Sequence, residues 1–410
     1  MTTAAATLFR RIADYGSRAN PYPLYAELRA SGVAAQEDGS FLVGSYHEIA
    51  ALLHDPRISS DRRNRSVPAP DLAENGDAAV PFIGHDDPEH DRLRRIAMRP
   101  FGPPHSPCRV TAMHGDIAAI AGGLLDALHG RDRIDVVDDF AYPLPVNVIC
   151  GLLGVPPGDE PRFRAWSEAI IGGFDPTPGA DPDQRARDAA AARTAMRHYL
   201  GDLADRQRGK CDGGMLSAYV NDPGPEGAFT RSELMANAVL LLIAGHETTV
   251  NLITNGMLTL LRHQEALERL RREPALMPMA MEELLRFESP VQMLPQRTAL
   301  TDVEVAGVTV RKGAPLVLVL AAGNRDPQRF PDPDRFDPAR GDNQHLGFGS
   351  GVHICFGAPL ARLEAQIALT ELIRRLDGPR LVEDPPPYRR SPILRGPRHL
   401  GLRIAAVRPR

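Results

Sequence analysis

Lysine and closely spaced cysteines are both scarce in this sequence. Lysine occurs only at Lys210 and Lys312, so arginine carries nearly all the positive charge, and a formal net charge of −4 gives no sign of nucleic-acid binding. No Cys-x-x-Cys pair is present, because the four cysteines stand far apart, at Cys108, Cys150, Cys211 and Cys355. This spacing argues against a disulfide framework and against a zinc cluster, and it suits a reducing cytosol.

Long hydrophobic runs are also missing. Arg10 and Arg11 interrupt the only apolar stretch near the N-terminus, so we expect neither a signal peptide nor an anchor there. The longest apolar run, residues 234–244, is too short to span a bilayer. Of the 410 residues, 43% are hydrophobic, which is enough for a sizeable core in one large domain or two ordinary ones. We therefore expect a soluble, cytoplasmic protein with no membrane partner.

The most informative stretch is a glycine-dense loop around one cysteine, residues 347–357, followed directly by a helix-like run. Glycines at this density let the backbone adopt positive φ and approach a flat object closely. Cys355 stands just ahead of the helix, where backbone N–H groups and the helix dipole stabilise a thiolate. These features favour a metal-binding thiolate. A dinucleotide loop is excluded because no third glycine has the required spacing, and the remaining alternative is a surface turn with a chance cysteine.

The order Phe-Gly-x-Gly-x-His-x-Cys-x-Gly, met from Phe348 to Gly357, resembles the haem-binding loop of cytochrome P450 monooxygenases. In that family the cysteine is the axial ligand of the haem iron. The resemblance implies that Cys355 binds the iron of haem b (iron protoporphyrin IX). It also implies cofactor contacts from the rest of the loop, at Phe348, Gly349, His353 and Gly357.

A second informative stretch is a long helix predicted from about residue 230 to 263. It begins with a capping box at residues 230–233, is apolar on nearly all sides over 234–244, and is therefore predicted to be buried. Polar residues then follow. The hydroxyl of Thr248 can compete for the carbonyl of Ala244 and open the helix locally. Without other information, an ordinary kink beside a solvated Glu247 is the alternative.

Residues 244–249 resemble the oxygen-binding kink of P450s, where an acid–alcohol pair delivers protons during oxygen activation. The resemblance implies that Glu247 relays protons from solvent, that Thr248 hydrogen-bonds the activated oxygen, and that Ala244 contacts the cofactor.

Three further cationic or titratable residues enter through the same resemblance. His90 and Arg94 share one face of a helix predicted to start at Pro88, and alone they would be an ordinary solvated face. In the family, the matching residues bind the haem carboxylates, and so does an arginine at the place of Arg297. These contacts would be charge-assisted hydrogen bonds.

A Glu-x-x-Arg motif, Glu283 and Arg286, is weak alone because exposed ion pairs of this spacing are common. A proline-rich stretch downstream supplies Arg335. The trio resembles the buried ion-pair network that supports the haem-binding core of P450s, so we assign it a structural role.

The resemblance covers about residues 20–402 and implies one cytochrome P450 domain over residues 1–410, mainly α with a smaller β-rich portion (α+β). Helices are expected mostly within about 85–290 and 355–377. The β-rich parts are expected near 35–45, 291–322 and 380–405, including a hairpin over 303–310.

The implied enzyme inserts one oxygen atom from O₂ into a hydrophobic organic substrate by hydroxylation or epoxidation, in the tailoring of a polyketide- or macrolide-like natural product. Electrons would come from a separate ferredoxin and ferredoxin reductase, with Arg92, Arg95 and Arg99 as a candidate docking surface. We expect a monomer. The candidate pocket residues are apolar: Ile83, Val239, Leu240, Ala244, Val291, Met293, Leu294 and Ile393.

Two alternatives stay open. One is a non-catalytic haem protein that senses or carries a gas, which would not need the pair Glu247 and Thr248. The other is a P450-like protein that acts on a carrier-tethered substrate, or serves as a partner without turnover. An activity assay separates these alternatives from a monooxygenase acting on a small substrate.

Overall fold

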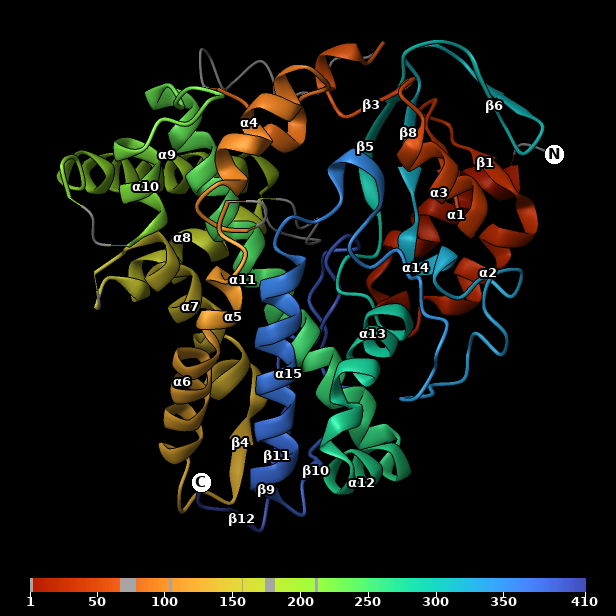
Figure 1. The fold of residues 1–410 in the computed structure, drawn as a ribbon. Helices are drawn as coiled ribbons and strands as arrows, with labels where there is room; N and C mark the ends of the chain where they lie inside the picture. The colour runs from red at the N-terminus through yellow and green to blue at the C-terminus, as the bar shows by residue number, and fades with distance from the viewer. Residues whose placement is uncertain (1–2, 67–78, 103–104, 157, 174–180, 211–212) are drawn as a thin grey trace. The chain divides into compact units, whose positions relative to one another are not determined.

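The computed structural model describes residues 3–66, 79–102, 105–156, 158–173, 181–210 and 213–410 (Figure 1). The chain divides into two compact units. One, called the sheet unit, comprises Met1–Leu72, Ala121–Ala141 and Thr248–Arg410. The other, called the helical unit, comprises Ala73–Ile120 and Tyr142–Glu247. The expected fold class, mainly α with a smaller β portion, is confirmed, and the single-domain assignment stays a prediction.

The helical unit is built from helices in two separate stretches of the chain. The longest that lies wholly inside it, α9, has 25 residues rich in alanine and arginine, which are good helix formers. It packs on α8 through Phe163 and Tyr199, whose rings lie 5.1 Å apart. The elements are η4 (Phe82–Gly84), α4 (Glu89–Met98), α5 (Arg109–Ala112), α6 (His114–Asp126, which ends in the sheet unit), α7 (Pro143–Leu153), α8 (Glu160–Gly172), α9 (Pro182–Arg206), α10 (Met215–Asn221) and the first half of α11 (Arg231–Arg262).

Helix α11 begins at the predicted capping box. The N–H of Glu233 donates to Thr230 Oγ1 (3.2 Å), and the N–H of Thr230 donates to the Glu233 carboxylate (2.7 Å). By length and composition α11 is apolar enough to cross a membrane, so the expectation from the shorter run 234–244 was too narrow. However, 67% of its apolar window is buried inside the structure, as in the core helix of a globular protein.

The larger sheet of the sheet unit has strand order β1-β2-β8-β5-β3 (Figure 1). Strands β2 and β8 are parallel, and the other neighbours are antiparallel. Leu316 and Leu318 of β8 enter one core cluster with α3, whereas Val317 and Val319 enter another with α1 and α2, as the alternation of side chains along a strand requires. The bounds are α1 (Thr3–Ala13), η1 (Tyr15–Ser17), α2 (Tyr22–Ser31), β1 (Val33–Ala35), β2 (Phe41–Val43), α3 (Tyr46–His54), β3 (Ile58–Ser59), η2 (Arg62–Asn64), β5 (Leu294–Ala299) and β8 (Pro315–Leu318).

The smaller sheets are one local hairpin and two pairings of segments farther apart in the chain. The predicted hairpin is confirmed as β6 (Val303–Val305) and β7 (Val308–Val310), with Ala306 and Gly307 at positive φ in its turn. In a region expected to be mostly helical, β4 (Arg133–Asp135) instead pairs with β11 near the C-terminus. The remaining elements are η5 (Val137–Ala141, a π-helical turn), α12 (Gln264–Arg272), η6 (Pro274–Leu276), α13 (Met277–Phe287), α14 (Leu320–Gly323), η7 (Gly351–His353), α15 (Ala358–Arg375), β9 (Leu376–Asp377), β10 (Arg380–Leu381), β11 (Gly401–Arg403) and β12 (Ala406–Val407).

Candidate active site

The cysteine loop, residues 347–357, is held by its own backbone and by α3. The N–H of Cys355 donates to the carbonyl of Phe348 at 2.9 Å, which closes the loop. Gly349 and Gly351 both have positive φ, a conformation that side chains with a Cβ adopt rarely. At Gly351 a Cβ would also lie 2.1 Å from the carbonyl oxygen of Leu53. Gly349 is therefore required by backbone conformation, and Gly351 by backbone conformation and by close approach to α3.

The thiol of Cys355 lies directly ahead of α15. Gly357 is the N-cap of this helix, and Pro359 occupies its first turn, where a missing N–H costs nothing. Cys355 is exposed, and so is the neighbouring Ile354 at 47%. An exposed thiol beside an apolar side chain, at the positive end of a helix, fits a flat apolar cofactor whose metal takes a thiolate ligand.

The sequence did not reveal what fixes the flank of this loop. Arg362 of α15 lies over the ring of Phe348 at 4.6 Å and forms two hydrogen bonds of 2.7 and 2.8 Å with the carboxylate of Glu282. His345 also binds Glu282, at 3.1 Å. Burial raises the pKa of Glu282, but the hydrogen bonds from His345 and Arg362 outweigh it and lower this pKa to about 2. Glu282 thus ties α13 to both ends of the loop.

Glu247 and Thr248 are consecutive residues of α11, and the boundary between the two units falls between them. The helix is continuous through them, so an opening at Thr248 does not amount to a break. Glu247 is 2% exposed, which contradicts the alternative of a solvated carboxylate. The preceding His246 is 1% exposed, and its ring packs edge-on against Tyr142 with centroids 4.4 Å apart.

In the helical unit, His90 and Arg94 share one face of α4, as predicted. His90 is 2% exposed, so the alternative of a solvated face is wrong for this residue. Its Nδ1 lies 3.2 Å from Asp87, and both His90 and Arg94 pack against the ring of Phe82. Burial lowers the pKa of His90; Asp87 opposes this effect and Arg94 adds to it. Ala244 is an exposed residue of α11 in the same unit.

Arg297 lies on β5 in the sheet unit and is 8% exposed. The pairing of β5 with β8 shifts register between Leu294 and Arg297, which is an irregularity of the kind that re-aims a side chain.

The candidate pocket residues fall in both units. In the sheet unit the structure joins two of their segments, because the N–H of Gln292 donates to the carbonyl of Ile393 at 2.8 Å and Val291 pairs with Leu394. The assignment of Met293 to the pocket is corrected, because this residue is 1% exposed and lies in a core cluster with Tyr25. The partly or largely exposed candidates are Ile83, Val239 and Leu240 in the helical unit, and Val291, Leu294 and Ile393 in the sheet unit.

The ion-pair network around Glu283 requires a second correction. Glu283 and Arg286 are fully buried and form two hydrogen bonds of 2.7 and 2.8 Å. The other arginine on Glu283 is Arg340, at 3.1 and 3.2 Å, and not Arg335. The side chain of Arg335 is exposed, and its backbone carbonyl accepts from both Arg286 and Arg340.

Comparison with known proteins places this architecture in one class, the proteins of the cytochrome P450 fold. Ligand-free CYP164A2 from Mycobacterium smegmatis superposes with a TM-score of 0.87 and 36% identity, covering 97% of this chain and all of that one. The cytochrome P450 family model matches residues 204–402. The cytochrome P450 monooxygenase PikC from Streptomyces venezuelae is 40% identical over 94% of this chain and 91% of its own length. The 6-deoxyerythronolide B hydroxylase from Saccharopolyspora erythraea is 36% identical, over 93% and 96%.

The chain belongs to the cytochrome P450 family, as the cysteine loop predicted. It is a monooxygenase, an oxidoreductase that uses O₂, a haem-iron cofactor and electrons from a redox partner.

Proposed function

We propose that this monooxygenase hydroxylates or epoxidises a hydrophobic natural product, with haem b bound through the thiolate of Cys355. The observation that carries the proposal is the exposed thiol at the N-terminus of α15, inside a loop closed by the bond from Cys355 N–H to Phe348. When bound, the haem iron activates O₂, and a thiolate ligand favours O–O cleavage. The chain's own contribution is to keep the sulfur ionised by the helix dipole and the N–H groups of the first turn.

The remaining cofactor contacts follow from charge and place. Arg297, His90, Arg94 and His353 would bind the haem carboxylates by charge-assisted hydrogen bonds. Phe348 and the glycines Gly349 and Gly357 would lie against the ring. The near-complete burial of His90 and Arg297 supports this role, because charge-assisted hydrogen bonds are stronger where water is excluded.

Glu247 and Thr248 would handle protons. The buried carboxyl of Glu247 would pass a proton inward from solvent, and the hydroxyl of Thr248 would donate a hydrogen bond where oxygen is activated. The burial of Glu247 and its place directly before Thr248 on α11 support the assignment, because a group that relays protons must lie within reach of the reacting groups inside the protein.

The substrate class is inferred from the pocket candidates and from a relative. The candidates Ile83, Val239, Leu240, Val291, Leu294 and Ile393 are apolar, which favours a hydrophobic molecule. The relative named 6-deoxyerythronolide B hydroxylase supports tailoring of a polyketide- or macrolide-like compound. We further propose a cytoplasmic monomer that receives electrons from a ferredoxin and its reductase. The side chain of Arg99 is only 13% exposed, so the docking proposal is limited to Arg92 and Arg95, which are 34% and 62% exposed.

Replacement of the proposed ligand tests the central assignment. In Cys355→Ser, we expect the reduced carbon monoxide complex to lose the red-shifted absorption of a thiolate-ligated haem. The matched control is Cys108→Ser, because Cys108 is also exposed but lies at the N-cap of the short helix α5. Unchanged absorption in Cys355→Ser would refute the ligand assignment.

The proton-handling role is tested by Thr248→Ala. We expect O₂ and electron consumption to continue while product formed per electron falls, by about tenfold or more. The control is Thr259→Ala on the same helix, where the hydroxyl only donates back to the carbonyl of Asn255 (2.7 Å). Equal coupling in wild type and Thr248→Ala would show that this hydroxyl has no part in the reaction.

A further inference from the structure

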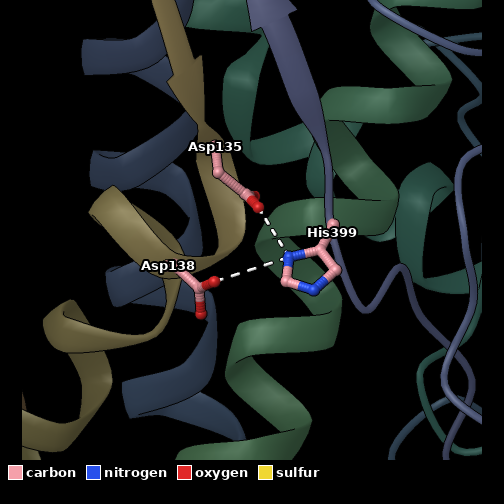
Figure 2. A group of neighbouring side chains, drawn as sticks. All are labelled: Asp135, Asp138 and His399. Carbon is pink, nitrogen blue, oxygen red and sulfur yellow. Dashed lines mark hydrogen bonds and ion pairs between the residues drawn. The ribbon is translucent and has the colours of Figure 1, made fainter.

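Three metal-ligating side chains converge in the sheet unit, away from the cysteine loop in sequence. Figure 2 shows Asp135 and Asp138 directed toward the imidazole of His399. His399 Nδ1 lies 2.7 Å from Asp135 Oδ2 and 3.4 Å from Asp138 Oδ2, and one ligand atom from each residue lies within 4.8 Å of the others. The pairing of β4 with β11, which sets Gly401 opposite Asp135, brings these segments together.

Asp135 is held in a fixed orientation. Its Oδ1 accepts from the backbone N–H of Val137 (2.9 Å) and of Leu400 (3.0 Å), which leaves Oδ2 directed at His399. Hydrogen bonds of this kind orient the ligands of metal sites. Asp138 turns its Oδ2 to the same imidazole nitrogen, while its Oδ1 lies 3.5 Å from Arg398. The oxygen that faces His399 is therefore not the one that faces Arg398.

The cluster borders an open space. A surface cavity of about 330 Å³ is lined by Asp135 and His399, together with Arg133, Glu383 and Gly401. The three candidate ligands are between 26% and 47% exposed at their side chains. An ion could therefore reach them from solvent, and water in the cavity could complete its coordination.

We propose that Asp135, Asp138 and His399 form a binding site for a divalent transition-metal ion, for which Zn²⁺ is the best match. Imidazole nitrogen with carboxylate oxygen is a ligand set that zinc accepts, whereas Mg²⁺ and Ca²⁺ prefer oxygen alone. Zinc–ligand bonds of about 2.0–2.2 Å place tetrahedral ligands roughly 3.3 Å apart. The separation of His399 from Asp138 already matches this value, and Asp135 lies about 0.6 Å closer to His399 than this value.

The bound ion would link the segment 135–138 to the start of β11. It would replace the contacts between His399 and the two aspartates by metal–ligand bonds. The site is independent of the proposed oxidation chemistry, so the fate of one proposal does not decide the other.

Metal titration of the haem-loaded protein tests the site. The protein is treated with a chelator, exchanged into chelator-free buffer and titrated with zinc chloride by calorimetry. We expect one tight site in the wild type, weakened by about 100-fold in His399→Ala and in Asp138→Asn. Asp138→Asn keeps the size of the side chain while removing its charge. His105→Ala, which removes an exposed histidine of the helical unit, should retain the site. Equal zinc affinity in wild type and His399→Ala would overturn the proposal.

Anomalous diffraction from zinc-soaked crystals of the wild type gives a second readout that does not depend on folding of a variant. A peak at bonding distance from His399 Nδ1 and both carboxylates supports the site. If saturating zinc gives no peak there, His399 and the two aspartates form ion pairs only, and the proposal is overturned.

Discussion

Two carboxylates near the C-terminal end of α13, one fully buried and one slightly exposed, make a useful comparison. Glu283 lies inside the helix and Glu288 is its C-cap, and each is bound by two arginines. Glu283 is fully buried, and it also accepts from the N–H of Asp337 (3.0 Å) and from Asn343 (3.1 Å). All its partners lie between residues 286 and 343, on the stretch that leads into the cysteine loop.

Glu288 binds across the chain instead. Its carboxylate contacts Arg395, Arg325 (3.4 Å) and the hydroxyl of Tyr22 (3.0 Å). Arg395 also donates to the carbonyls of Arg18 and Ala19. Burial raises the pKa of Glu288, but the charges of Arg395 and Arg325 outweigh it and lower this pKa. The network therefore fastens the N-terminal segment and the C-terminal loop to α13.

The comparison teaches that similar chemistry serves two purposes. The Glu283 network is local and densely bonded, and it stabilises the stretch next to the haem-binding loop. The Glu288 network is long-range and joins both ends of the chain to one helix. Loss of the first should therefore affect cofactor binding as well as stability, whereas loss of the second should affect stability alone.

The largest expected effect is that of Glu283→Gln. Removal of the charge leaves the buried Arg286 and the partly exposed Arg340 without their carboxylate, and breaking a buried ion pair costs about 3–5 kcal/mol in comparable cases. We expect little folded protein and little bound haem, measured by yield and by the ratio of haem to protein absorption. Full haem content in a stable Glu283→Gln variant would contradict the role assigned to this network.

Glu288→Gln should come next. Its side chain is 14% exposed, so water reaches the site and the expected loss is smaller, about 2–3 kcal/mol in the free energy of unfolding. Haem content should stay normal, while limited proteolysis near residues 15–22 becomes faster because the N-terminal segment loses its attachment. If haem loss precedes the change in proteolysis, the two networks do not divide their roles as described.

A paired substitution sharpens the assignment of the second arginine. Arg340→Met removes contacts to Glu283 and to the carbonyls of Pro331, Asp332 and Arg335, so we expect a loss of about 2 kcal/mol. Arg335→Met changes an exposed side chain and should stay within about 0.5 kcal/mol of the wild type. Thermal unfolding of the two variants decides between them, and a larger loss in Arg335→Met would restore the original assignment.

The contrast between Arg335 and Arg340 shows where prediction from the sequence succeeds and where it fails. The cysteine loop and the capping box of α11 could be predicted because their chemistry is written in a few consecutive residues, whereas the pair Glu283–Arg286 was predicted only through the family resemblance. Arg340 was missed because both arginines follow one proline-rich stretch, and only its turns decide which side chain faces inward.

Long-range partners were out of reach for a related reason. Tyr22 with Glu288, and Asp135 with His399, are brought together by tertiary packing, and no local pattern announces them. Met293 was misplaced because an apolar residue looks the same in sequence whether it lines a pocket or fills a core.

The smallest expected effect concerns Glu282, which lies beside Glu283 but binds the loop flank through His345 and Arg362. Its pKa falls from an ordinary 4.5 to about 2 in the folded protein. Its ionised form therefore stabilises the fold fully above pH 4.5, and the contribution disappears as pH falls toward 2. We expect the free energy of unfolding of the wild type to exceed that of Glu282→Gln at pH 6 by about 1 kcal/mol, with the gap closing on acidification. Denaturant unfolding of both proteins across this range measures the gap. The control is Glu371→Gln, which removes an ion pair with Arg374 within α15. A gap that stays constant with pH would mean that Glu282 acts by packing and not by charge.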